Sequence, residues 1–169
     1  MPRIRLLRPA ALVLALSAGF LSAACSSGGG SGGIQDPSVY EEELGRVAIQ
    51  DLTAGLDRIL QKHNYDITRR EEIYSTVYYE TLWKPREVQP DELSQGVVGA
   101  RSRVIVEGRR GGGEGDIFRV FMKFENQAQL SGSGAWQAFP VTDDARSIYR
   151  EVFGDLQMET RAGVRSIGD

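Results

Sequence analysis

Two neighbouring segments in which apolar and charged residues alternate constrain the fold of this chain more than any other feature. In 103–108 and 117–126 most even positions are apolar and most odd positions are charged. Successive side chains of a β-strand point to opposite faces, so the pattern predicts two strands with one apolar face. The glycine-rich run 109–115 between them predicts a hairpin turn. The inward-facing residues would be Val104, Val106, Phe118, Val120, Met122 and Phe124.

The charged face of this hairpin carries a candidate binding surface. One antiparallel register pairs Glu107 with Arg119, Ile105 with Phe121, Arg101 with Glu125 and, unfavourably, Arg103 with Lys123. Ile105 and Phe121 would then form a small exposed apolar centre, with Arg103 and Arg119 in its basic rim, which is typical of a protein contact. Isolated exposed apolar residues explain the pattern equally well.

An amphipathic helix is predicted over 38–63, where apolar residues recur at three- and four-residue intervals. The apolar stripe consists of Leu44, Val47, Ala48, Leu52, Leu56, Ile59 and Leu60. Asp36 and Pro37 suit a helix start, and His63 suits a C-terminal end.

A second helix is predicted to begin at Thr142, whose side chain would cap it, with two aspartates in the first turn. Between the helices, 65–69 predicts a short strand and 72–83 a longer one. A sheet with one apolar face needs helices to cover it. We therefore expect residues 34–169 to form a single α+β domain, a two-layer sandwich in which an antiparallel sheet of three to four strands packs against an N-terminal and a C-terminal helix.

Two long connections need an explanation. Residues 84–100 exceed the usual length of a structureless loop, which indicates either a functional or a disordered segment. Residues 127–141 place Trp136 and Phe139 in a glycine- and serine-rich stretch. These aromatic residues either fold back on the sheet or meet a partner, so Trp136 joins the candidate binding residues.

The N-terminus has the order of a secretory signal over residues 1–24: three arginines, an apolar run and small residues before Cys25. Its apolar core of about 12 residues is short of the roughly 20 that span a membrane, so we expect it to be cleaved. Leu21-Ser22-Ala23-Ala24-Cys25 resembles the lipobox of bacterial lipoproteins, although the leucine stands four residues before the cysteine instead of three.

The lipoprotein resemblance implies that Cys25 is lipidated and anchors the mature chain to a membrane. Residues 26–33 are only serine and glycine and would form a flexible tether within the segment 25–33. In this class of protein a residue other than aspartate after the cysteine, here Ser26, favours the outer membrane. The domain would then face the periplasm.

Charge and residue usage exclude several classes of function. Removing the three arginines of the signal takes the net charge from -3 to -6, which makes nucleic acid an improbable partner. With one cysteine and one histidine, a multi-cysteine or histidine zinc site is not expected. The glycines of 111–115 lack the following helix that a phosphate loop needs. We expect no metal, no cofactor and no catalytic residue.

Three short motifs resemble the helix-grip lipoproteins that accompany the outer-membrane β-barrel assembly machinery. They are the run 59–68, the Thr81-Leu82-Trp83 strand end and the Arg101-Ser102-Arg103 strand. The resemblance spans 47–156 and implies a non-catalytic envelope role. The accessory subunit of that machinery has two such domains and a long arm, whereas one domain and a short linker are expected here.

The sequence therefore predicts a non-catalytic, membrane-anchored scaffold or binding domain with a partner protein of the cell envelope. The alternative is a carrier with a cleft for a lipid or another apolar ligand, and a cell-wall hydrolase is the weakest hypothesis.

Overall fold

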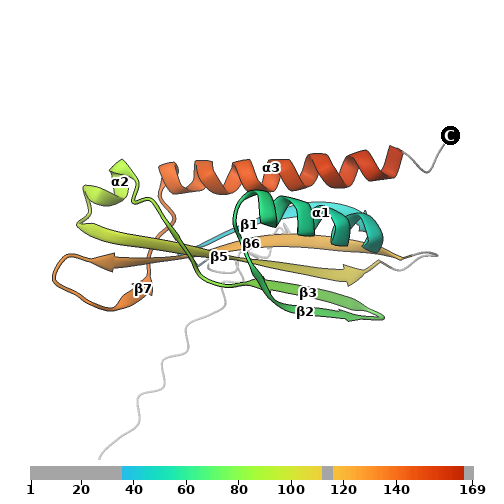
Figure 1. The fold of residues 1–169 in the computed structure, drawn as a ribbon, viewed down its shortest axis with the longest axis horizontal. Coiled ribbons are helices and arrows are strands. Elements are labelled where there is room, and N and C mark those ends of the chain that lie inside the picture. Colours follow the sequence, from blue (N-terminus) through green and yellow to red (C-terminus); the bar gives the residue numbers. More distant parts are fainter. Residues whose placement is uncertain (1–35, 112–115, 166–169) are drawn as a thin grey trace, which may run out of the picture. The chain divides into compact units, whose positions relative to one another are not determined.

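The alternating segments form a long hairpin of two strands, β5 (Val97–Arg110) and β6 (Ile117–Leu130), in the middle of the sheet. The structure is a computed structural model that describes residues 36–111 and 116–165 (Figure 1). Glycines of the predicted turn at 112–115 lie outside these residues. The strands pair up to the turn, since the amide of Gly111 donates to the carbonyl of Ile117 at 3.1 Å.

The hairpin register differs from the predicted one by two residues: Arg103 lies opposite Glu125, and Ile105 lies opposite Lys123. A shift of two keeps every side chain on its predicted face, whereas a shift of one would invert the faces. The shift also replaces an Arg–Lys pair by an Arg–Glu pair. All six predicted inward-facing residues are buried: Val104, Val106, Phe118, Val120, Met122 and Phe124.

The remaining elements extend the sheet on both sides of the hairpin and cover one of its faces. They are β1 (Val39–Ala48), α1 (Ile49–Lys62), β2 (Ile67–Ile73), β3 (Thr76–Thr81), β4 (Lys84–Arg86), α2 (Pro90–Leu93), β7 (Trp136–Ala138) and α3 (Asp143–Arg165). The strand order is β1-β6-β5-β3-β2, with β4 paired to β5 and β7 paired to β6, and all pairs are antiparallel.

The first half of the predicted 38–63 helix is a strand. Asp36 Oδ1 accepts hydrogen bonds from the amide and hydroxyl of Ser38, which forms a turn into β1 and not a helix cap. A bulge between Glu43 and Gly45 shifts the pairing with β6, and Gly45 has the left-handed φ of +100° that this shift requires.

The prediction of a three- to four-stranded sandwich with two terminal helices is therefore wrong. Within residues 36–111 and 116–165 the sheet has seven strands, the first element is a strand, and a third helix is present. A turn at Tyr74 and Ser75 also divides the predicted 72–83 strand into β2 and β3. The segments predicted as long connections contain β4, α2 and β7. The sequence did not reveal these elements, because segments this short leave little periodicity.

Helices α1 and α3 lie together on the apolar face of the sheet (Figure 1). The Phe124 ring of β6 stacks on Tyr149 of α3, with centroids 4.7 Å apart. Gly55 allows α1 and α3 to approach closely, since a Cβ there would lie 3.3 Å from Leu156 Cδ1. As predicted, His63 lies at the C-terminal end of α1; its Nε2 contacts Asp155 Oδ2 of α3 at 2.7 Å.

Candidate functional site

The candidate site is the face of the sheet opposite α1 and α3, which we call the outer face. It is formed by the odd-numbered residues of β5 and β6 and by their neighbours on β1 and β3. In Figure 1 the described helices lie on the other side of the sheet. The outer face carries all five candidate binding residues: Arg103, Ile105, Arg119, Phe121 and Trp136.

Arg103 lies at the centre of the outer face between two carboxylates. Its Nε donates to Glu125 Oε2 at 2.6 Å, and its Nη1 donates to Glu80 of β3. Burial opposes the positive charge, but the hydrogen bond and the attraction to Glu125 outweigh it and raise the pKa of Arg103. Two neighbouring acids therefore already satisfy this predicted binding residue.

Lys123 shows the same pattern on β6. Its Nζ donates to Glu107 of β5 at 3.0 Å and lies 3.7 Å from Glu41 of β1. Burial opposes its charge too, yet the hydrogen bond to Glu107 and the attraction of both acids raise the pKa of Lys123. The charges of the outer face therefore neutralise one another across three adjacent strands.

Arg119 and Phe121 lie near the turn end of the outer face. Arg119 donates to both carboxylate oxygens of Glu43, at 2.7 and 2.6 Å, and its Cζ lies 5.2 Å from the centroid of the Phe121 ring. The hydrogen bond from Arg119 lowers the pKa of Glu43. The arginine thus covers part of the half-buried aromatic ring.

Ile105 differs from the expectation of an exposed apolar centre, because only 7% of it is accessible to solvent. It lies directly between Glu80 on β3 and Lys123 on β6. Long charged side chains bury their aliphatic stems against apolar neighbours while their charged ends remain in water. Ile105 therefore supports the charged surface and offers little area to a partner.

The most exposed aromatic side chain of the outer face belongs to a group that we call the aromatic–arginine stack, formed by Trp83, Arg101 and Trp136. The Cζ of Arg101 lies 4.9 Å from the Trp83 ring centroid and 4.5 Å from the Trp136 ring centroid. Trp136 lies against the backbone of Gly99, where a Cβ would be 3.3 Å from its Cη2 atom. It remains 37% exposed.

Arg101 differs from the other outer-face cations in its partners. Its Nε and Nη2 donate to the amide oxygen of Gln127, at 2.9 and 2.6 Å. Within the described part of the chain it forms no ion pair. A guanidinium has five N–H donors, so donors remain for an acceptor brought by another molecule. Stacking between two indole rings fixes its orientation for that contact.

A buried polar network lies beneath this end of the sheet. Arg86 of β4 forms a two-pronged ion pair with Glu92 of α2, with Nη1 to Oε2 at 2.7 Å, and its Nη2 donates to Asn126 Oδ1 at 2.7 Å. Tyr149 also donates to Asn126 Oδ1, at 3.0 Å. Burial opposes the charge of Arg86, but Glu92 outweighs it, and the pKa of Arg86 is raised. The connection 84–100 is therefore an ordered structural element.

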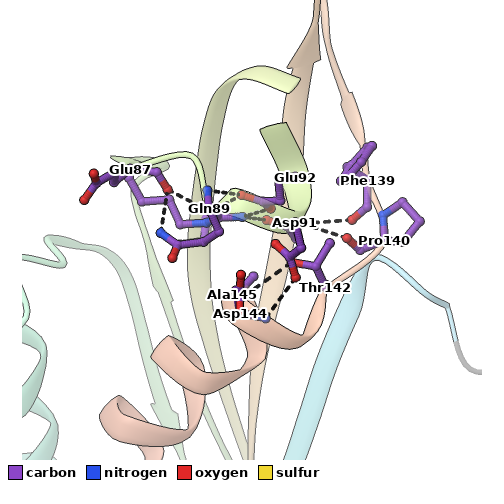
Figure 2. A network of polar contacts seen from close by, with 12 residues as sticks. Glu87, Gln89, Asp91, Glu92, Phe139, Pro140, Thr142, Asp144 and Ala145 are labelled. Carbon is purple, nitrogen blue, oxygen red and sulfur yellow. Dashed lines mark hydrogen bonds and ion pairs between the residues drawn. The ribbon is translucent and has the colours of Figure 1, made fainter. Parts of the chain in front are cut away.

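The network also fixes the chain that follows the stack. Asn126 Nδ2 donates to the carbonyls of Phe139 and Pro140, at 3.0 and 3.3 Å, immediately after β7. Asp91 of α2 accepts from the amide of Asp144 at the start of α3, at 3.0 Å (Figure 2). Both contacts hold the segment after β7 in place, so Trp136 is positioned by structure on either side of it.

Thr142 is the predicted cap of α3. The amide of Ala145 donates to Thr142 Oγ1 at 3.4 Å, and two aspartates occupy the first helical turn (Figure 2). This long hydrogen bond agrees with the predicted start of the helix.

Sequence reasoning missed two members of the stack, Trp83 and Arg101. In the sequence analysis Trp83 lies at the end of a predicted strand and Arg101 lies opposite Glu125, and neither is assigned to the binding surface. The sequence contained part of the information needed to find the stack, because Gly99 and Arg101 occupy successive outward positions of β5. Only the return of β7 along β6 brings Trp136 to them.

Other predicted features lie outside the described residues or were searched within them. Cys25, the signal segment and the tether belong to residues 1–35, which the structure does not describe. Across 36–111 and 116–165, no cluster of three or more histidine, cysteine, aspartate or glutamate side chains has the arrangement of a metal site. None of the helices in those two ranges combines the length and the apolar composition of a transmembrane span.

Comparison with known proteins gave no match to a family model and none to a curated protein.

Proposed function

We propose that this chain is a non-catalytic, membrane-anchored lipoprotein that binds another envelope protein through the outer face of its sheet. The aromatic–arginine stack of Trp83, Arg101 and Trp136 is the observation that carries the proposal. Tryptophan and arginine are the residues most enriched in the energetically dominant centres of protein interfaces.

The distribution of charge on the outer face supports a specific contact point. Arg103, Arg119 and Lys123 each have at least one carboxylate partner within the domain. A partner that bound one of these cations would first have to break its ion pair within the domain, and that cost would offset part of the binding free energy. Arg101 has donors to spare, so the partner would bring a carboxylate or a carbonyl oxygen to Arg101 and an apolar or aromatic surface to Trp136.

The anchor and location remain part of the proposal. Lipidation at Cys25, with the following tether of serine and glycine, would hold the domain close to the membrane. Several acyl chains give stable attachment, whereas a single chain is marginal. The outer membrane and a periplasmic orientation follow from the lipobox resemblance, and a role in outer-membrane protein assembly follows from the three motifs quoted above.

The alternative of an apolar-ligand carrier has less support. Such a carrier needs space between helices and sheet, and that space is filled. Leu52 and Leu56 of α1, Met122 and Phe124 of β6 and Leu156 of α3 are completely buried there.

Site-specific photo-crosslinking tests the proposal. A photoreactive phenylalanine analogue replaces Trp136 in the full chain, expressed in its native host, and a second chain carries it in place of Tyr74. Tyr74 is a matched control, because it is an aromatic residue that is 84% exposed on the β2–β3 turn. The centroid of its ring lies 4.2 Å from the Cζ of Arg110. We expect one defined protein adduct from position 136 and none of the same mass from position 74.

Substitution gives the quantitative arm of the test. In detergent-solubilised membranes, Trp136→Ala and Arg101→Ala should each lower recovery of the crosslinked partner by about 10-fold or more, as central interface residues do. The melting temperature should stay within a few degrees of the parent, and Tyr74→Ala should retain full recovery. Equal recovery with all three variants would show that the partner binds elsewhere.

A further inference from the structure

The two edges of the sheet carry different charge patterns. The β1 edge has three consecutive glutamates, Glu41 to Glu43, whereas the β2 edge has two arginines followed by two glutamates, Arg69 to Glu72. Among the described strands, β2 ends the strand order and pairs with β3 alone, and it forms the lower edge of the sheet in Figure 1. An edge strand presents unpaired backbone donors and acceptors to another strand.

We propose that β2 pairs in antiparallel fashion with β2 of a second copy of this chain. A twofold axis perpendicular to the sheet would relate the two copies and join their sheets into one. Closed twofold symmetry is the commonest arrangement of homo-oligomers, and it makes the same patch meet itself. This inference concerns an edge of the sheet and does not rest on the function proposed for the outer face.

The charge pattern of β2 complements itself under that symmetry. Antiparallel strands about such an axis place side chains of the same face opposite each other. In one register Glu71 lies opposite Glu71 of the second copy, and Arg70 of each copy lies opposite Glu72 of the other. In the other register Arg70 lies opposite Arg70 of the second copy, and Arg69 of each copy lies opposite Glu71 of the other. Either register therefore forms two stabilising cross-strand Arg–Glu pairs, which outnumber the single like-charged pair at the axis.

The contacts within the domain define which side chains share a face. Arg70 and Glu72 lie on the helix side: the Cζ of Arg70 is 5.2 Å from the Tyr79 ring centroid, and Glu72 accepts from the Tyr79 hydroxyl. Arg69 lies on the outer side, with its Cζ 4.8 Å from the Tyr78 ring centroid, and its Nε donates to Glu71 at 2.7 Å. Each face thus holds one arginine and one glutamate.

The β2 edge is accessible to a second strand. Its residues after Ile67 are exposed, and an open groove of about 680 Å³ separates the edge from α1. The groove is lined by side chains that include Asp57, Gln61, Asn64, Asp66, Arg69 and Arg70. A bulge between Ile67 and Arg69 interrupts the regular pairing, so the proposed contact uses Arg69 to Ile73.

Charged residues on an edge commonly prevent strand pairing, and β1 shows how. Any antiparallel pairing of β1 with itself that aligns Glu41 to Glu43 sets like charges opposite one another, which destabilises the pair. On β2 the two signs occur in equal number and in blocks. The charges of β2 therefore favour pairing with an antiparallel copy of β2, whereas the charges of β1 oppose pairing of β1 with itself.

Two charge-reversed edges test the proposal. One full chain carries Arg69→Glu with Arg70→Glu, and the other carries Glu71→Arg with Glu72→Arg, each purified in detergent and analysed by native mass spectrometry. We expect the parent chain to be a dimer. In each variant the dissociation constant of the dimer should rise by about 10-fold or more. An equimolar mixture of the variants should form a heterodimer, because the acidic edge then meets a basic one.

The mixture separates charge pairing from misfolding, and circular dichroism checks each variant. If either double variant unfolds, the single changes Arg69→Glu and Glu71→Arg, on half-exposed side chains, repeat the test for the register that pairs these two residues. Arg70→Glu and Glu72→Arg repeat it for the other register. Trp136→Ala should leave the dimer intact, which distinguishes this contact from the proposed outer-face function. A monomeric parent chain, a variant that dimerises as tightly as the parent, or a mixture that stays monomeric would overturn the proposal.

Discussion

The two faces of one hairpin are built on opposite principles. On the helix-covered face, Val106, Met122 and Phe124 lie side by side and exclude solvent completely. One residue along each strand, Glu107 and Lys123 on the outer face form an ion pair in partial contact with water. The same backbone thus presents a dry apolar layer on one side and a paired charge layer on the other.

The difference teaches where stability and recognition reside in this domain. Apolar burial yields about 25 cal/mol per Å² removed from water, so the helix-covered face supplies most of the driving force for folding. Exposed ion pairs contribute about 0 to 1 kcal/mol each. Substitutions of the charged residues or of the aromatic–arginine stack on the outer face should therefore lower the free energy of unfolding only slightly. Such tolerance suits a surface that selects a partner.

Truncation of the helix-covered face should have the largest effect. Phe124→Ala removes a fully buried ring that stacks on Tyr149, and it should lower the free energy of unfolding by about 4 kcal/mol. Urea denaturation followed by circular dichroism measures this change. A loss below about 1 kcal/mol would mean that the two faces do not differ as the packing indicates.

An intermediate effect is expected at the centre of the outer face. Arg103→Ala leaves the half-buried carboxylates of Glu80 and Glu125 without their common partner, and it should lower the free energy of unfolding by about 1 kcal/mol. Added salt should reduce the difference from the parent chain, because it screens the charges. An effect as large as that of Phe124→Ala would assign a core role to the outer face.

The smallest effect is expected at the exposed pair of Arg119 and Glu43. Of the three variants, Arg119→Ala should change the free energy of unfolding least in neutral solution, because water screens the pair. The pKa of Glu43 is lowered in the folded chain by the hydrogen bond from Arg119. Its contribution is therefore present above the ordinary glutamate pKa and is lost as the pH falls through the lowered value.

Denaturation of the parent chain and Arg119→Ala at pH 7 and pH 3 tests that sign. The small difference at pH 7 should be smaller at pH 3, because acidification shifts Glu43 toward its protonated form. A difference that grows on acidification would contradict the assignment of this pair.

Local sequence patterns predicted some elements and misled at others for physical reasons. The alternation of β5 and β6 identified their buried face, because a sheet covered on one side enforces a period of two. In β1 the buried residues are Tyr40, Leu44 and Val47. The bulge inserts one residue into the strand and turns its period of two into the spacing of a helix, which the sequence analysis therefore predicted.

The candidate site was predictable only in part. The outward positions of Arg103, Arg119 and Phe121 followed from alternation alone. The assembly of Trp83, Arg101 and Trp136 depends on β7, a strand of three residues whose pairing with β6 has no signal in its own periodicity. Its position is set by Asn126 and the buried ion pair of Arg86 and Glu92, which lie far from it in the sequence.

By itself the sequence determined the central hairpin, the faces of its two strands, the start of α3 and the end of α1, since each depends on neighbours within a few residues. It also predicted the signal and the lipidated cysteine, which lie outside the described residues. Only the tertiary structure decided the number of strands, the strand at 39–48, the two-residue register and the aromatic–arginine stack. Those features depend on which distant segments meet, and side-chain burial and cross-strand pairing between them outweigh local preference.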